Sequence, residues 1–330
     1  HKMCYATCVT LMDEAQTEDV SFLAHMRGWL PQGVSAPDKL EVKVVEAAHK
    51  QARQMTVPCA NSSNDLQTSN CIVAEVQEAF EILQHASDLS PRNPDIDKSL
   101  TKLVAMVLSP KSPEVVKSVL ANQEVQILLK TMWNALSKAE FAMESWWTRR
   151  FLKEEVSLEG TNTFWYRDNY KELTALEIEH LETMGHRPRP GDNLIFVGGG
   201  PLPFSALDYF FQTGANITVV ESDHLAAQLS SALLRQLNLT GNIKVQHAAG
   251  EMFDYKGATH LIVAALVQDE HLVIQRALDT AALSVIGARS ADGLRSILYP
   301  PLHMATQDLS IKCTGSSSVN ERVVNTLVTF

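Results

Sequence analysis

The chain has few cysteines, and their pattern excludes two classes of small stabilised domain. Five occur among 330 residues, at Cys4, Cys8, Cys59, Cys71 and Cys313. They are odd in number and none form a C-x-x-C pair, so the sequence indicates neither a zinc site nor a disulfide framework. We therefore expect reduced thiols in a cytoplasmic protein.

Long hydrophobic runs and excess positive charge are also lacking. No apolar stretch approaches the roughly 18 residues that a membrane span needs, and we see no apolar core of a signal peptide. Lysine and arginine number 28 against 38 acidic residues, so the formal net charge is −10. Neither a nucleic acid nor a membrane is expected as a partner. The histidines are not at ligand spacing, so no metal site is expected.

What is present is organised around residues 193–205, which read NLIFVGGGPLPFS. The apolar run at 194–197 is typical of a strand buried on both faces. Gly198, Gly199 and Gly200 allow positive φ and let the backbone approach a ligand closely. A helix-like segment then begins at Phe204. Strand, glycine turn and helix together predict the opening of a nucleotide-binding βαβ unit.

The residues after the glycines indicate the ligand of this unit. A second strand, 217–220, ends in Glu221, which can accept hydrogen bonds from both ribose hydroxyls of an adenosine. The glycines do not form G-x-G-x-x-G, because position 203 is proline. The pattern therefore favours a nucleoside cofactor without phosphates, such as S-adenosylmethionine, over a dinucleotide.

The C-terminal part alternates between strands and helices. We predict strands at 194–198, 217–221, 243–247, 260–264 and 283–288, with helices at 204–213, 224–237 and 270–282. This order predicts an α/β fold with a Rossmann-like, doubly wound parallel sheet in a domain spanning 189–330. The β-branched segment 321–330 predicts a last strand, antiparallel, at or next to the sheet edge.

The N-terminal part, 1–188, reads as an all-helical domain. Residues 1–85 form an extension of unknown role, with helices expected at 20–30, 40–55 and 71–86 and a polar loop at 58–69. Further helices are expected at 95–108, 123–152 and 171–181. Another is expected to begin at Pro113, with Ser112 as its N-cap.

The long helix at 123–152 carries two glutamates on one face. Glu140 and Glu144 lie four residues apart, and Trp146 and Trp147 follow. Partial desolvation beside the tryptophans would raise the pKa of a glutamate toward that of a useful base. The alternative is a solvated helix face with the two tryptophans in the core.

Several separate segments together resemble one family. They are AEFAMESWW (139–147), FWYRDNY with LTALE (164–177), VGGGPLPFSAL (197–207), AALV (264–267), RSADGLRSILYP (289–300) and VVNTLV (323–328). In this order and spacing they resemble nicotianamine synthases and the related bacterial opine-metallophore aminobutanoyltransferases, over roughly residues 90–330. The resemblance implies transfer of the 3-amino-3-carboxypropyl (aminobutanoyl) group of S-adenosylmethionine to an amine. 5′-Methylthioadenosine would leave, and the product would be a nicotianamine- or opine-type metallophore.

The resemblance also implies roles for particular residues. Glu144 would be the base and Tyr170 would line the reaction chamber, with Glu140 as a second candidate. Cofactor contacts would come from Gly198, Gly199, Gly200, Pro201, Glu221, Gly250, Glu251, Ala264, Ala265 and Leu266. Substrate contacts would come from Tyr166, Arg289 and Tyr299, and Arg167 would either meet a substrate carboxylate or be solvated.

Two other functions stay open at the level of sequence. An S-adenosylmethionine-dependent methyltransferase would share the fold and the glycine turn, and a non-catalytic binding protein could be built on the same fold. The acceptor is a small-molecule amine or amino acid, with S-adenosylmethionine itself, histidine and glutamate as candidates. The number of transfers is open, and the helical extension makes a homodimer plausible.

Overall fold

The computed structural model describes residues 42–43, 64–302 and 311–330. By internal contacts the chain divides into residues 1–35 and 36–330, and every described residue belongs to the second unit. The helices expected at 20–30 and 40–55 lie outside the described residues, apart from 42–43. The predicted domain boundary near residue 188 stays a prediction.

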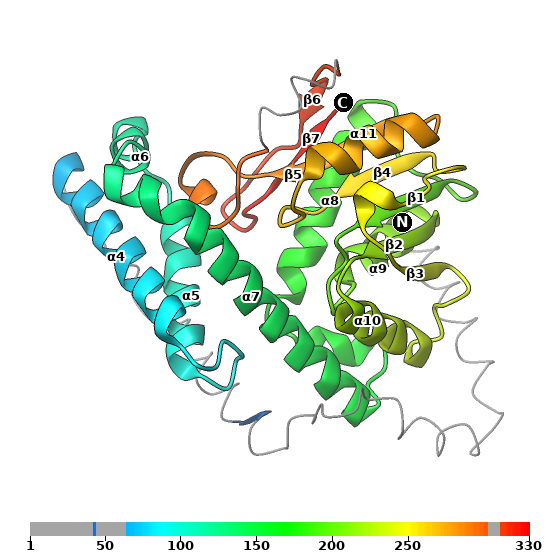
Figure 1. The fold of residues 1–330 in the computed structure, drawn as a ribbon, viewed down its shortest axis with the longest axis horizontal. Coiled ribbons are helices and arrows are strands. Elements are labelled where there is room, and N and C mark those ends of the chain that lie inside the picture. The colour runs from blue at the N-terminus through cyan, green and yellow to red at the C-terminus, as the bar shows by residue number, and fades with distance from the viewer. Residues whose placement is uncertain (1–41, 44–63, 303–310) are drawn as a thin grey trace. The chain divides into compact units, whose positions relative to one another are not determined.

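Five α-helices and one short 3₁₀ helix precede the sheet in the described part of the chain (Figure 1). They are α4 (Asp65–His85), α5 (Pro94–Leu108), α6 (Pro113–Leu120), α7 (Gln123–Glu154), η1 (Glu159–Thr163) and α8 (Arg167–Thr183). Asparagine and serine side chains accept hydrogen bonds from first-turn N–H groups at four N-caps: Asn64, Asn93, Ser112 and Asn122. The predicted Ser112 cap and the single long helix from Gln123 are confirmed.

The loop expected at 58–69 is wrong for its last residues, because α4 begins at Asp65. The Asn64 side chain accepts from the N–H of Leu66 at 3.0 Å. The Thr68 and Ser69 hydroxyls donate to the carbonyls of residues four positions earlier. Polar residues that suggest a turn therefore serve here as the cap and first turns of a helix.

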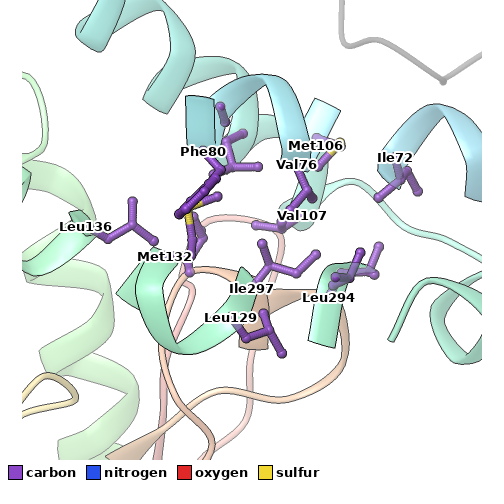
Figure 2. Packing of buried hydrophobic residues seen from close by; sticks show 14 of the residues in the cluster. Ile72, Val76, Phe80, Met106, Val107, Leu129, Met132, Leu136, Leu294 and Ile297 are labelled. Carbon is purple, nitrogen blue, oxygen red and sulfur yellow. The ribbon is translucent and has the colours of Figure 1, made fainter. Parts of the chain in front are cut away.

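The helices share a hydrophobic core with a segment that follows the fifth strand of the sheet (Figure 2). Ile72, Val76 and Phe80 form the predicted stripe on α4, and they belong to one cluster with Leu129 and Met132 of α7. Leu294 and Ile297, from the 3₁₀ helix η3 (Gly293–Ile297), join the same cluster. The helical part and this 3₁₀ helix are thus packed as one core.

The sheet has seven strands in the order β3-β2-β1-β4-β5-β7-β6. They are β1 (Asn193–Val197), β2 (Asn216–Glu221), β3 (Ile243–His247), β4 (His260–Val263), β5 (Val285–Ser290), β6 (Gly315–Ser316) and β7 (Thr326–Thr329). Strands β1 to β5 pair in parallel, whereas β7 is antiparallel to both β5 and β6. The predicted α/β class is confirmed, as is the last strand next to the edge. The edge strand β6 was missed, because two residues carry no periodic signal.

Helices cover both faces of the sheet. They are α9 (Phe204–Thr213), α10 (His224–Gln236) and α11 (Glu270–Thr280), close to the predicted ranges. Val273 and Ile274 of α11 pack in one cluster with Ile195 and Val197 of β1. Phe196, which points to the other face, contacts Tyr209 of α9. Strand β1 therefore lies between α9 and α11.

Two further properties bear on the sequence expectations. Within the described ranges, no helix is long and apolar enough to cross a bilayer. Cys71 is disulfide-bonded, so the expectation of a reduced thiol is wrong for this residue, whereas Cys313 is a free cysteine. A cytoplasmic location stays a prediction.

Candidate functional site

A cavity of about 500 Å³ opens at the carboxyl ends of β1, β2 and β4. Strand β1 lies between β2 and β4, so the cavity occupies the switch point where such sheets bind ligands. All ten residues predicted to contact the cofactor line it: Gly198, Gly199, Gly200, Pro201, Glu221, Gly250, Glu251, Ala264, Ala265 and Leu266. Glu140, Glu144, Tyr170, Arg289 and Tyr299 line the same cavity.

The glycine turn after β1 leaves no room for side chains. Gly198 and Gly200 have φ of +83° and +64°, in the left-handed region that favours glycine. A Cβ at Gly199 would lie 2.2 Å from a methyl of Val219, and one at Gly200 would lie 2.4 Å from Glu144 Oε2. The turn is therefore closely packed against β2 on one side and against a carboxylate of α7 on the other.

Glu221 ends β2 and is held by the backbone. Its Oε2 accepts from the Gly200 N–H at 2.8 Å and its Oε1 from the Asp223 N–H at 2.8 Å. Each carboxylate oxygen keeps a further lone pair for a ligand hydroxyl. The carboxylate is thus fixed beside the glycine turn with capacity left to bind a diol.

Glu144 of α7 is buried and paired with Tyr170 of α8. The Tyr170 hydroxyl donates to Glu144 Oε1 at 2.6 Å, and Glu144 is 7% exposed. Burial raises the pKa of Glu144 well above its ordinary value, the nearby Glu140 raises it further, and the Tyr170 hydrogen bond opposes the rise. The desolvation expected from the sequence is confirmed, and the solvated helix face is excluded for this residue. A carboxylate with a raised pKa is a stronger base than an ordinary glutamate.

A second carboxylate and phenol pair lies one helical turn away. The Tyr299 hydroxyl donates to Glu140 Oε2 at 3.3 Å. Burial raises the pKa of Glu140 from 4.5 to about 7, while the Tyr299 hydrogen bond and the charge of Arg289 act in the opposite direction. Glu140 and Glu144 therefore titrate as neighbours within one cavity.

A smaller cavity of about 140 Å³ continues from the first toward α5. Its lining includes Leu100, Val104, Met143 and Trp165. The two cavities share five residues: Glu140, Tyr170, Arg289, Tyr299 and Asn325. Tyr166 lines the smaller cavity and not the larger one, so it lies apart from the predicted cofactor contacts.

Arg289 is anchored by a buried glutamate that the sequence did not suggest. Its Nε and Nη2 donate to the two oxygens of Glu177 at 2.8 and 3.0 Å, and Nη2 also donates to Ser205 Oγ at 3.0 Å. Glu177 is fully buried. The available signal was its place on the helix face shared with Leu173 and Leu181, where a carboxylate requires a partner. In the described part of the chain, Arg289 Nη1 makes no hydrogen bond.

Arg167 is neither solvated nor placed to meet a substrate carboxylate, and both expectations for it are wrong. Its Nη1 and Nη2 donate to Asp208 Oδ2 and Oδ1 at 2.6 and 2.5 Å. Its guanidinium also lies over the Phe204 ring, 4.5 Å from the centroid. Both charged side chains are 6% exposed, so the pair joins α8 to α9 inside the protein. Among the described residues, no group of three or more metal-ligating side chains comes together.

Comparisons with known proteins agree with this geometry. A family model described as "Nicotianamine synthase protein" matches residues 64–329. Probable nicotianamine synthase 3 from Hordeum vulgare is 30% identical over 257 residues, covering 71% of this chain and 72% of the relative. L-histidine 2-aminobutanoyltransferase from Yersinia pestis is 30% identical over 112 residues, covering 34% of this chain and 42% of that protein.

A solved structure shares the fold. The crystal structure of MtNAS in complex with MTA and tNA aligns with a TM-score of 0.67 at 21% identity, covering 79% of this chain and 96% of MtNAS. The family model covers most of the chain, and the Hordeum vulgare relative aligns over most of its own length as well. The chain belongs to the nicotianamine synthase family.

Proposed function

We propose that this protein transfers the aminobutanoyl group of S-adenosylmethionine to an amine and releases 5′-methylthioadenosine. Family membership supports this, since relatives are named nicotianamine synthases and an aminobutanoyltransferase. A structure of an MtNAS variant is in complex with S-adenosylmethionine. The observation that carries the proposal is that the Glu144–Tyr170 pair lines the same cavity as the glycine turn and Glu221.

The cavity residues fit S-adenosylmethionine. The glycine turn provides a close-packed backbone surface, and the free lone pairs of Glu221 match the two ribose hydroxyls. Gly250 and Glu251 would contact the adenine side, and Ala264 to Leu266 would flank the sulfonium end. When bound, S-adenosylmethionine supplies an electrophilic carbon next to sulfur, at which an amine forms its new bond as 5′-methylthioadenosine leaves.

Glu144 would act as the general base. An amine attacks only when neutral, so a residue must take its proton. Burial raises the pKa of Glu144 well above its ordinary value, and Tyr170 fixes its orientation through a 2.6 Å hydrogen bond. Burial also raises the pKa of the Tyr170 hydroxyl well above its ordinary value, so Tyr170 stays a neutral donor.

The acceptor would bind where the two cavities meet. Arg289 lines both cavities, and its Nη1 is available to a carboxylate, while Glu177 holds the rest of the guanidinium in place. Tyr166 and Tyr299 would complete this region on the side of the smaller cavity. A carboxylate-binding group near a base is the arrangement that an amino-acid acceptor requires.

The experiment is mass spectrometry of the purified protein incubated with S-adenosylmethionine alone, with L-histidine and with L-glutamate. 5′-Methylthioadenosine with a product of three joined aminobutanoyl units, from S-adenosylmethionine alone, would indicate nicotianamine formation. 5′-Methylthioadenosine with a one-arm adduct that requires an added amino acid would indicate an opine-type enzyme. Release of S-adenosylhomocysteine would support methyl transfer instead, and no release of either nucleoside would contradict the proposal.

A further inference from the structure

Asn325 lies where the two cavities meet, one residue before β7. It lines both cavities, and it is 7% exposed. Among the residues that the structure describes, Asn325 Oδ1 finds no hydrogen-bond donor. A buried amide oxygen without a partner opposes folding. Its presence on a cavity wall therefore points to a ligand that supplies the donor.

The sheet, not the side chain, holds Asn325 in position. In the antiparallel pair, Leu327 lies opposite Arg289 and Thr326 lies opposite Ser290. Opposed residues share a face and side chains alternate along a strand, so Asn325 falls on the same side as Leu327 and Arg289. Asn325 is thus directed toward the cavity beside Arg289 without any hydrogen bond from its own amide.

The charges around Asn325 indicate the kind of group that it binds. The cavity walls near it carry two carboxylates, Glu140 and Glu144, two phenols, Tyr170 and Tyr299, and one guanidinium, Arg289. An amide oxygen only accepts hydrogen bonds, so it is complementary to N–H groups and not to an anion. Arg289 already offers the carboxylate contact, so the amine of the same ligand is the group left to place.

We propose that Asn325 Oδ1 accepts a hydrogen bond from the reacting amine of the acceptor amino acid, an inference that rests on the proposed function. In the transfer the nitrogen–carbon bond forms, the carbon–sulfur bond breaks, and the amine proton passes to Glu144. Asn325 takes no proton. It holds one N–H, so that the lone pair faces the carbon under attack and the second N–H faces the base.

The test compares Asn325→Leu with Asn320→Leu, a change to an asparagine of the same segment whose amide nitrogen and oxygen are both hydrogen-bonded. Asn320 Nδ2 donates to Glu172 at 2.7 Å, and its Oδ1 accepts from the N–H groups of Arg322 and Val323. We expect Asn325→Leu to lower kcat/KM for 5′-methylthioadenosine release at least tenfold with an unchanged or higher Tm. Asn320→Leu should lower the Tm. A fall in Tm for Asn325→Leu would indicate a structural role and overturn the proposal.

Ligand-binding measurements distinguish a contact of Asn325 with the acceptor amine from a contact with the amine of the transferred arm. 5′-Methylthioadenosine lacks the arm, whereas S-adenosylhomocysteine carries it. We expect Asn325→Leu to bind both within twofold of the wild type by calorimetry. Weaker binding of S-adenosylhomocysteine alone would assign Asn325 to the arm and overturn the acceptor role, as would a kcat/KM within twofold of the wild type. Failure of the wild type to release 5′-methylthioadenosine would instead contradict the proposed function itself.

Discussion

Glu144 owes its chemistry to its immediate neighbours. Its carboxylate packs against Gly200, receives a hydrogen bond from Tyr170 and lies near Glu140. Each contact comes from a different part of the chain, and together they keep the carboxylate dry, oriented and basic. A raised pKa makes a glutamate a stronger base toward the proton of an amine.

Glu144→Gln keeps the shape of the side chain and removes its basicity. We expect kcat to fall by about 10²- to 10⁴-fold, the usual contribution of a general base. Affinity for 5′-methylthioadenosine should change little, which calorimetry can check. Glu124→Gln, on the exposed first turn of the same helix, is the matched control and should keep full activity. Full turnover by Glu144→Gln would remove it from the mechanism.

The pH dependence of activity depends on the same residue. Glu144 must be deprotonated to act, so kcat/KM should fall as the pH drops through its raised pKa. The Tyr170 hydrogen bond lowers this pKa, so Tyr170→Phe should move the acidic limb of the pH–rate profile to higher pH. Glu140 and Glu221 also act on Glu144 and remain in place in this variant.

Tyr209→Phe is the control for the pH experiment. Tyr209 is a buried tyrosine whose hydroxyl donates to Glu177 at 3.0 Å, away from Glu144. This variant should leave the acidic limb where it is in the wild type. If Tyr170→Phe left the limb unmoved as well, or moved it to lower pH, Tyr170 would not set the pKa of the base.

Among the helices and strands, the turn between β1 and α9 brings the sheet against α7. Gly200→Ala would add strain at φ of +64° and drive a Cβ to 2.4 Å from Glu144 Oε2. We expect a destabilisation on the order of 1–3 kcal/mol and a loss of activity greater than tenfold. Gly185 has a similar φ of +78°, and a Cβ added there would have nothing within 4 Å, so Gly185→Ala is the control. It should lose comparable stability, measured by urea unfolding, and keep its activity.

Helices α8 and α9 are joined by the buried Arg167–Asp208 pair. Asp208→Asn leaves the Arg167 charge buried without its counter-charge, which should lower the free energy of unfolding by about 3–5 kcal/mol. The exposed Arg187–Glu182 pair offers the comparison, since its side chains are 30% and 63% exposed. Glu182→Gln should cost less than about 1 kcal/mol. Equal losses in the free energy of unfolding for the two variants, measured by denaturant titration, would mean that the buried pair does not stabilise the packing of α8 against α9.

Within the described residues, one hydrophobic cluster lies around the helices and another lies beside the sheet. Ile297 and Ile274 are fully buried, one in each cluster. Ile297→Ala and Ile274→Ala should each cost about 2–5 kcal/mol and shift one shared thermal transition. Two separate transitions in calorimetry, each moved by one variant alone, would show that the clusters unfold independently.

Most of the fold could be predicted from the sequence because the local sequence patterns favour the same secondary structure that the tertiary packing stabilises. The apolar strand at 194–197, the glycines after it and the Ser112 cap each indicate their own structure. The start of α4 and the strand β6 could not be predicted. The first looks like a turn until its cap is formed, and the second exists only because β7 pairs with it.

The candidate site was predictable to the same degree. The residues that follow the strands directly could be predicted to share one site, because the carboxyl ends of parallel strands lie along the same edge of the sheet. Glu177 and Asp208 were missed, because a buried carboxylate is recognised by its partner, which lies far away in sequence. Arg167 was misread for the same reason. Asn325 belonged to a segment noted for its resemblance, but its unpaired amide is visible only in three dimensions.

Strand β7 lies between β5 and β6 although it is the last of the described strands to be synthesised. A growing chain therefore completes its glycine turn and Glu221 long before Asn325 leaves the ribosome. A polypeptide that ended before β7 would contain every residue predicted to contact the cofactor. Its β5 would lack the antiparallel strand that pairs with it in the complete sheet. The glycine motif alone therefore does not complete the sheet, because β5 gains its antiparallel neighbour only once β7 has been made.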